Sequence, residues 1–176
     1  ALINKIKEIK GDVPQRWVAH SYGGVLMLAY LARQFNSVKI DSMVFFGTKR
    51  RIGVFNLQKL WLIDILWNFL SKISISLFGY LPAQKMGIGS DNETKKSHRE
   101  TVSWVNSKPW LDWNDSFDYA ASLKNLSLPP CLFLTVAKDK VLGHTKDVIF
   151  MMKEIGIQPI KKEGQIHELR ILGKSN

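Results

Sequence analysis

The chain has 176 residues, of which 45% are hydrophobic and 23% charged, a composition typical of a folded domain and not of a disordered segment. Its single cysteine, Cys131, excludes an intrachain disulfide and a cysteine metal cluster, and favours a reducing compartment such as the cytoplasm. The net charge is +10, but the basic residues are spread along the sequence without a recognition-helix or aromatic RNA-binding pattern, so we expect no nucleic-acid partner.

The spacing of apolar residues predicts helices and strands that alternate on both sides of a long central interval. In chain order these are a helix over 1–10, a strand over 16–20, a helix over 22–34, a strand over 42–46, a strand over 131–137, a helix over 145–155 and a strand over 167–172. Two of these strands, over 42–46 and 131–137, are continuous apolar runs, and the strand over 167–172 alternates apolar with polar residues. Continuous apolar strands in alternation with helices predict the α/β class, with a parallel sheet that helices cover on both faces.

The interval between the second and third strands is too long for a simple connection and predicts a helical insertion. We therefore expect a core made of residues 1–48 and 128–176, with a cap over 49–127. The most apolar part of this cap, residues 57–81, is interrupted by charged residues, so it does not predict a transmembrane helix. It is either a mostly buried helix or a lid that meets an apolar substrate or a membrane surface.

The segment AHSYGG, residues 19–24, joins the first strand to the second helix. In it, Ala19, Ser21 and Gly23 form a small-x-Ser-x-Gly pattern, typical of a tight turn that lifts a nucleophilic serine out of a sheet. The alternative is a Ser-Gly turn without chemistry. The glycines lack the lysine and the longer pattern of a phosphate loop, and no His, Asp and Glu set has ligand spacing, so we expect neither a cofactor nor a metal.

A nucleophilic serine needs a base, and the base needs a carboxylate that orients it. Asp139 directly follows the apolar run CLFLTVA, at the carboxyl end of a predicted strand. Ser21 follows the first strand in the same way, and sites in parallel sheets form at this edge. Asp139 is therefore the candidate acid, and the alternative is a loop aspartate paired with a nearby lysine.

Together these segments resemble the α/β-hydrolase fold superfamily. The resemblance rests on AHSYGG, on the strand SMVFFGT and on LPPCLFLTVAKDKVLG followed by a helix, and GYLPAQKMGIGS in the cap is similar to a bacterial branch of predicted hydrolases. It implies that Ser21 is the nucleophile, that Asp139 is the acid, and that the backbone N–H of Tyr22 forms part of the oxyanion hole. It also implies a small-molecule acyl substrate, with ester hydrolysis as the expected reaction and acyl transfer or non-catalytic binding as alternatives.

In this family the base lies in the loop after the last strand, and two interpretations of the sequence place it differently. If residues 157–163 form that strand, His167 in the following loop is the base. If residues 167–172 form it, the base lies beyond Asn176. Since only one helix precedes the first predicted strand, we also expect the chain to be a fragment, inactive by itself, whose sheet has an exposed edge.

Overall fold

The computed structural model describes residues 2–53, 71–87, 91–140, 142–159 and 166–173. The chain divides into two compact units. Unit 1 joins Ala1–Arg50 to Pro109–Asn176, and unit 2 is Arg51–Lys108. Unit 2 is shorter than the insertion predicted over 49–127, because the segment that follows Lys108 belongs to unit 1.

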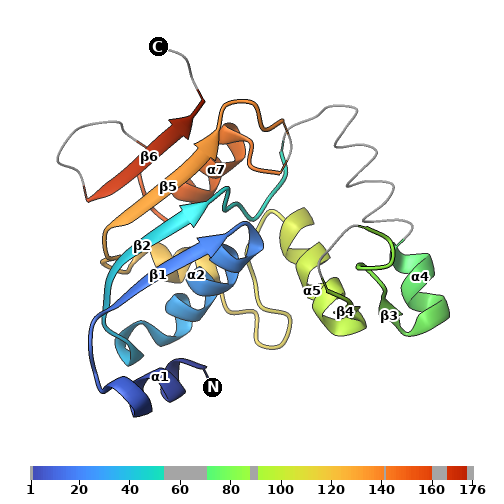
Figure 1. Cartoon of the computed structure of the whole chain (residues 1–176), viewed down its shortest axis with the longest axis horizontal. Helices are drawn as coiled ribbons and strands as arrows, with labels where there is room; N and C mark the ends of the chain where they lie inside the picture. The colour runs from blue at the N-terminus through green and yellow to red at the C-terminus, as the bar shows by residue number, and fades with distance from the viewer. Residues whose placement is uncertain (1, 54–70, 88–90, 141, 160–165, 174–176) are drawn as a thin grey trace. The chain divides into compact units, whose positions relative to one another are not determined.

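Unit 1 is built on a parallel sheet, which has four strands in the described part of the chain (Figure 1). The strand order is β1-β2-β5-β6, and each neighbouring pair is parallel, as the sequence predicts. Because all strands run the same way, their carboxyl ends meet at one edge of the sheet. The strands are β1 (Gln15–His20), β2 (Ile40–Phe46), β5 (Cys131–Val136) and β6 (His167–Leu172).

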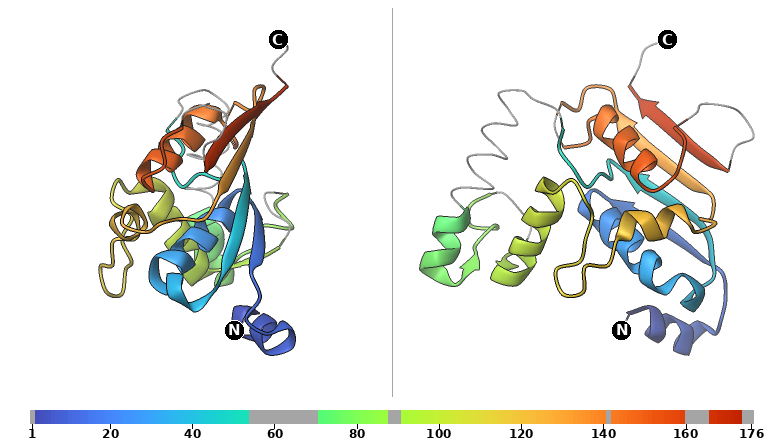
Figure 2. Two further views of the ribbon diagram at one scale, coloured as in Figure 1. Left: turned by 90° about the vertical axis from the view of Figure 1, so that its left-hand side faces the viewer. Right: turned by 180° about the vertical axis from the view of Figure 1, so that it is seen from behind.

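Three helices of unit 1 lie on one face of this sheet (Figure 2). They are α2 (Tyr22–Gln34), α6 (Tyr119–Lys124) and α7 (Thr145–Glu154). The core lies between them and the strands, where the rings of Phe45 and Phe133 pack with their centroids 4.8 Å apart. Leu28 of α2 and Met152 of α7 are fully buried in the same layer. Burial of this apolar surface is the main favourable term in the folding of unit 1.

The opposite face of the sheet differs from the expectation that helices cover both faces. Side chains alternate between the two faces of a strand, and along β1 the buried Trp17 and Ala19 alternate with exposed residues. Val18 of β1 is 61% exposed and Val136 of β5 is 48% exposed. The described helices therefore cover one face. Unit 1 also contains α1 (Leu2–Lys10), which has no buried residue, and the short 3₁₀ helix η1 (Phe35–Ser37).

The segment that follows Lys108 is attached to α2 by polar contacts. Ser122 of α6 donates a hydrogen bond of 2.7 Å to the carbonyl of Ala32. Arg33 forms ion pairs of 2.9 Å with Asp112 and 2.8 Å with Asp115. These contacts explain why residues 109–127, predicted to lie in the insertion, pack in unit 1 instead.

Unit 2 consists of helices α4 (Ser71–Phe78) and α5 (Lys95–Asn106) and the short antiparallel strands β3 (Tyr80–Leu81) and β4 (Glu93–Thr94). The side chain of Thr94 caps α5 by accepting a hydrogen bond of 3.1 Å from the N–H of Ser97. Most of the predicted apolar stretch 57–81 lies outside the described residues. Among the residues that are described, the helices are too short or too polar to cross a membrane.

Candidate active site

Ser21 lies between the last residue of β1 and the first residue of α2, where the sequence predicts a tight turn. Its φ and ψ angles are 50° and −125°, a conformation that costs a non-glycine residue on the order of 1–3 kcal/mol. Its N–H donates a hydrogen bond of 2.8 Å to the carbonyl of Phe46 at the end of β2. Its side chain does not cap α2. The turn therefore holds a half-buried serine in a strained conformation at the carboxyl edge of the sheet.

The close approach of α2 to the sheet occurs at Gly24 and not at Gly23. A Cβ atom on Gly24 would lie 2.9 Å from Cδ1 of Phe45 and closer still to the side chain of Thr48. A Cβ atom on Gly23 would meet no heavy atom within 4 Å. The sequence pattern places the need for a small residue at Gly23, but the structure places it at Gly24, which faces the end of β2.

This difference predicts opposite outcomes for two neighbouring substitutions. Gly24→Ala should lower the free energy of unfolding by about 1–3 kcal/mol, because the fully buried Phe45 and Thr48 leave no room for a methyl group. Gly23→Ala, the control, should raise it by up to about 1 kcal/mol, because alanine favours the helix. Urea unfolding of the full-length protein measures both values. Equal stabilities of the two variants would contradict this account of the turn.

Asp139 lies in the turn after β5, and its N–H donates a hydrogen bond of 3.1 Å to the carbonyl of Val136. A Cβ atom on Gly143 would lie 2.8 Å from Oδ2 of Asp139, so the carboxylate points towards the backbone of this loop. The same loop touches the end of β2, because a Cβ atom on Gly47 would lie 3.4 Å from Cα of Gly143. Ser21 and Asp139 thus follow two strands that flank β2, at the same edge of the sheet.

His167 lies near the opposite edge. It is the first residue of β6. In the register of the paired strands, His20 of β1 is aligned across the sheet with Arg170 of β6. His167 therefore lies about 10 Å before Arg170 along β6. In addition, β6 lies about 14 Å from β1, because three strand spacings separate them. Burial lowers the pKa of His167. The structure does not bring His167 to Ser21, because residues 167–172 form a strand of the sheet, as the second of the two interpretations predicts, and not the loop that follows one.

His144 lies closer to Asp139 in the sequence, but its ring has another role. Its Nδ1 atom accepts a hydrogen bond of 3.2 Å from the N–H of Lys146 and so caps α7. In the neutral ring Nε2 then carries the proton and cannot accept one from a serine. The sequence predicts Thr145 as the cap of this helix. In the structure the Thr145 hydroxyl instead forms a hydrogen bond of 3.0 Å with that of Thr135.

The described residues give little support for a cysteine nucleophile or for a metal site. Burial raises the pKa of the Cys131 thiol to about 12, so this side chain stays protonated and is a poor nucleophile at neutral pH. Within the described ranges, no three His, Cys, Asp or Glu side chains are grouped in a way that could hold a metal ion.

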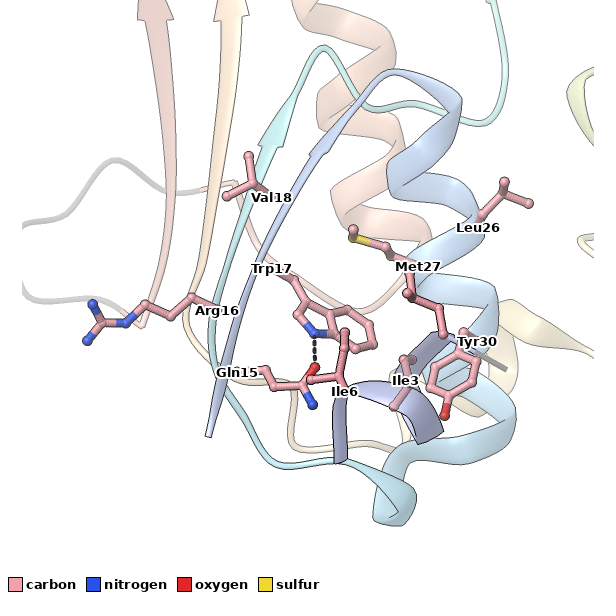
Figure 3. A pocket seen from close by; sticks show the side chains of 10 residues that line it. Ile3, Ile6, Gln15, Arg16, Trp17, Val18, Leu26, Met27 and Tyr30 are labelled. Atoms are coloured by element: carbon pink, nitrogen blue, oxygen red, sulfur yellow. Dashed lines mark hydrogen bonds between the residues drawn. The ribbon is translucent and has the colours of Figure 1, made fainter. Parts of the chain in front are cut away.

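An apolar groove of about 690 Å³ lies beside β1 (Figure 3). Neither Ser21 nor Asp139 lines it, so it is separate from the candidate site. One polar contact within it is the hydrogen bond of 3.0 Å from Trp17 Nε1 to Gln15 Oε1. Its walls come from α1, β1 and α2 and are formed by Leu2, Ile3, Ile6, Gln15, Arg16, Trp17, Val18, Leu26, Met27 and Tyr30.

Two residues beside the candidate site were missed by the sequence analysis. Lys49 and Arg50 follow the turn after β2, and they are only 7% and 1% exposed. The signal in the sequence is a run of three basic residues, Lys49-Arg50-Arg51, directly after a buried strand. Such a run usually lies on a solvated surface, and periodicity cannot show that two of its members are buried.

Solved structures that are similar to this chain include several hydrolases. A hydrolase from Oleispira antarctica matches 97% of this chain and 60% of its own length, with a TM-score of 0.55 and 14% identity. A carboxylesterase from the ammonia-oxidizing thaumarchaeon Nitrososphaera gargenis matches 98% of this chain and 61% of its own length, with a TM-score of 0.51 and 14% identity. The chain has the α/β-hydrolase fold. A monoacylglycerol lipase from Paleococcus ferrophilus matches 97% of this chain and 62% of its own length, with a TM-score of 0.50 and 12% identity.

These identities are low, and the likeness therefore shows the fold alone. The chain spans about 60% of the length of the solved structures that it matches. No family model matches its sequence, and no curated protein sequence matches it either.

Proposed function

We propose that this chain supplies the nucleophile and the acid of a serine hydrolase that acts on carboxylic esters or related acyl compounds. The observation that carries the proposal is the strained backbone of Ser21 at the turn from β1 to α2 in an α/β-hydrolase fold. Strain of this kind persists where the surrounding structure enforces it, and it is concentrated at functional sites. The turn exposes the hydroxyl at the edge of the sheet where Asp139 also lies.

In the proposed reaction, Ser21 Oγ attacks the carbonyl carbon of the ester while a base takes the Oγ proton. The negative oxygen of the tetrahedral intermediate accepts a hydrogen bond from the backbone N–H of Tyr22, the first residue of α2. The bond from the carbonyl carbon to the alcohol oxygen then breaks, and the alcohol leaves with the proton from the base. Water attacks the acyl-enzyme by the same route, which releases the carboxylic acid and restores Ser21.

The base that this reaction needs is a histidine at the carboxyl edge of the sheet. β6 ends at this edge, beside the turn that contains Asp139, because β6 pairs with β5 up to Leu172 and Val136. The N–H of Ala137 donates a hydrogen bond of 2.9 Å to the carbonyl of Leu172. A histidine in this position would donate Nδ1–H to the Asp139 carboxylate and present Nε2 to Ser21.

A small molecule with an apolar acyl group is the proposed substrate class. Three of the six tryptophans, Trp61, Trp67 and Trp104, fall within unit 2, the part of the predicted cap that forms its own compact unit. Aromatic side chains of this kind favour apolar ligands in binding sites.

A fluorophosphonate probe tests the proposal, because it phosphonylates an activated serine. The full-length protein should be labelled, and peptide mapping by mass spectrometry should place the label on Ser21. No labelling, or labelling that persists in Ser21→Ala, would overturn the proposal. The same measurement on heat-denatured protein shows whether the labelling depends on the folded site.

A further inference from the structure

The turn after β2 touches both halves of the candidate site. On one side Thr48 packs against Gly24, three residues after Ser21. On the other side Gly47 packs against Gly143, and Gly143 in turn lies close to the Asp139 carboxylate. The N–H of Gly47 also donates a hydrogen bond of 2.8 Å to the carbonyl of Leu134 in β5. The next residue in this turn, Lys49, is therefore held at the carboxyl edge of the sheet by neighbours on both sides.

Lys49 is an unusual residue for this position because its side chain is buried. Only 7% of it is exposed, and long charged side chains are almost never buried to this degree unless they are paired. The carboxylates whose charges act on it come from two elements, Asp147 from the first turn of α7 and Asp139 from the turn after β5. Asp147 is itself only 6% exposed. The buried ammonium is thus placed to interact with the acid that the proposed mechanism needs.

We infer that Lys49 is a positioning residue of the proposed hydrolase, whose ammonium holds the Asp139 carboxylate ionised and aligned towards the base. The inference rests on the proposed function, since it gives Asp139 the role of the acid. An ionised carboxylate accepts a stronger hydrogen bond from the N–H of the base than a neutral carboxyl group does, and a nearby cation favours the ionised form. Lys49 acts through Asp139 and does not touch the substrate.

The charge state of Lys49 should therefore appear in the pH dependence of the reaction. Burial lowers the pKa of Lys49 to about 8, while the charges of Asp147 and Asp139 oppose the shift. At pH 7 the side chain carries its proton, and above pH 8 it loses its charge. Its influence on Asp139 should be present below pH 8 and should disappear as the pH rises through that value.

The test is the second-order rate constant for fluorophosphonate labelling of Ser21 in the full-length protein between pH 6 and 10. In the wild type the rate constant should fall above pH 8. In Lys49→Met it should be about tenfold lower at pH 7, because the Asp139 carboxylate loses the cation that aligns it, and it should lack the fall above pH 8. Lys49→Arg, which keeps its charge throughout this range, should retain most of the rate at pH 7 and should also lack the fall.

A matched control is Lys39→Met. Lys39 is an exposed lysine that pairs with Asp12 at 2.7 Å, and it precedes the amino end of β2, at the other edge of the sheet. This variant should label like the wild type at every pH. It corrects for hydrolysis of the probe and for the general effect of removing a lysine charge.

A double-mutant cycle shows whether Lys49 acts through Asp139. Asp139→Asn should slow labelling, and adding Lys49→Met to Asp139→Asn should cause no further loss. A tenfold loss in both backgrounds would overturn the inference, as would wild-type rates and an unchanged pH profile in Lys49→Met. Both of these results leave the proposed function standing, whereas absence of label on Ser21 in the wild type overturns the two together.

Discussion

With p-nitrophenyl butyrate as substrate, Ser21→Ala should lower the kcat of the full-length protein by on the order of 10⁶-fold, the loss seen when a serine nucleophile is removed from a hydrolase. The reason is that an acyl-enzyme cannot form without the hydroxyl, and the remaining groups act as one unit with it. The substitution should leave the fold intact, because the Ser21 side chain does not cap α2. Release of p-nitrophenol under saturating substrate measures kcat directly.

Ser116 offers a matched control for Ser21. Its φ of 58° is also in the left-handed region, and its N–H donates a hydrogen bond of 3.0 Å to the carbonyl of Asp112. It lies in an exposed loop before α6, away from the carboxyl edge of the sheet. Ser116→Ala should change kcat by less than about twofold, as surface substitutions usually do. A similar loss of kcat in both variants would mean that the strained turn matters for stability and not for chemistry.

The largest effect on stability is expected at the ion pair between Arg50 and Glu154 of α7. Arg50 is 1% exposed, its Nε donates a hydrogen bond of 3.0 Å to Glu154 Oε2, and its second nitrogen pairs with Oε1. The Arg50 guanidinium carbon lies 5.7 Å from the ring centroid of Trp110, which is fully buried. Glu154→Gln should lower the free energy of unfolding by about 3–5 kcal/mol, because it removes the carboxylate that pairs with the buried Arg50 charge. Urea unfolding of the full-length protein measures the change.

Two further variants separate the buried charge from the rest of this contact. The double variant Arg50→Met and Glu154→Leu should recover most of the loss, because it removes both charges from the interior. The exposed pair Arg170 and Glu168, whose side chains are 59% and 46% exposed, is the control. Glu168→Gln should change stability by less than about 1 kcal/mol. If Glu168→Gln lowered the free energy of unfolding as much as Glu154→Gln does, burial of the ion pair would not be the cause of the loss.

Much of the fold is predictable from the sequence because its signals are local. The run of apolar residues in β5 and the spacing of apolar residues in α2 identify these elements, and the observed bounds of α2, Tyr22–Gln34, are those predicted. The order of strands and helices in turn predicts a parallel sheet, and the position of Ser21 after one strand and Asp139 after another predicts the edge where they lie.

The structure alone decided other features, because each depends on residues that are far apart in the sequence. The pairing of β6 with β5 decided between the two interpretations of residues 157–172, because it makes the predicted strand over 167–172 part of the sheet and places His167 near the edge opposite Ser21. The need for glycine at position 24 comes from Thr48, which belongs to the turn after another strand.

The sequence by itself determined the class of the fold, the candidate nucleophile Ser21 and the candidate acid Asp139, because helix and strand periodicity and turn chemistry act between near neighbours. The tertiary structure decided that Lys49 and Arg50 are buried, since the carboxylates of Asp139, Asp147 and Glu154, whose charges act on them, come from elements about 90 to 105 residues further along the chain. Burial and charge pairing are properties of packed surfaces, so they arise only when distant segments meet.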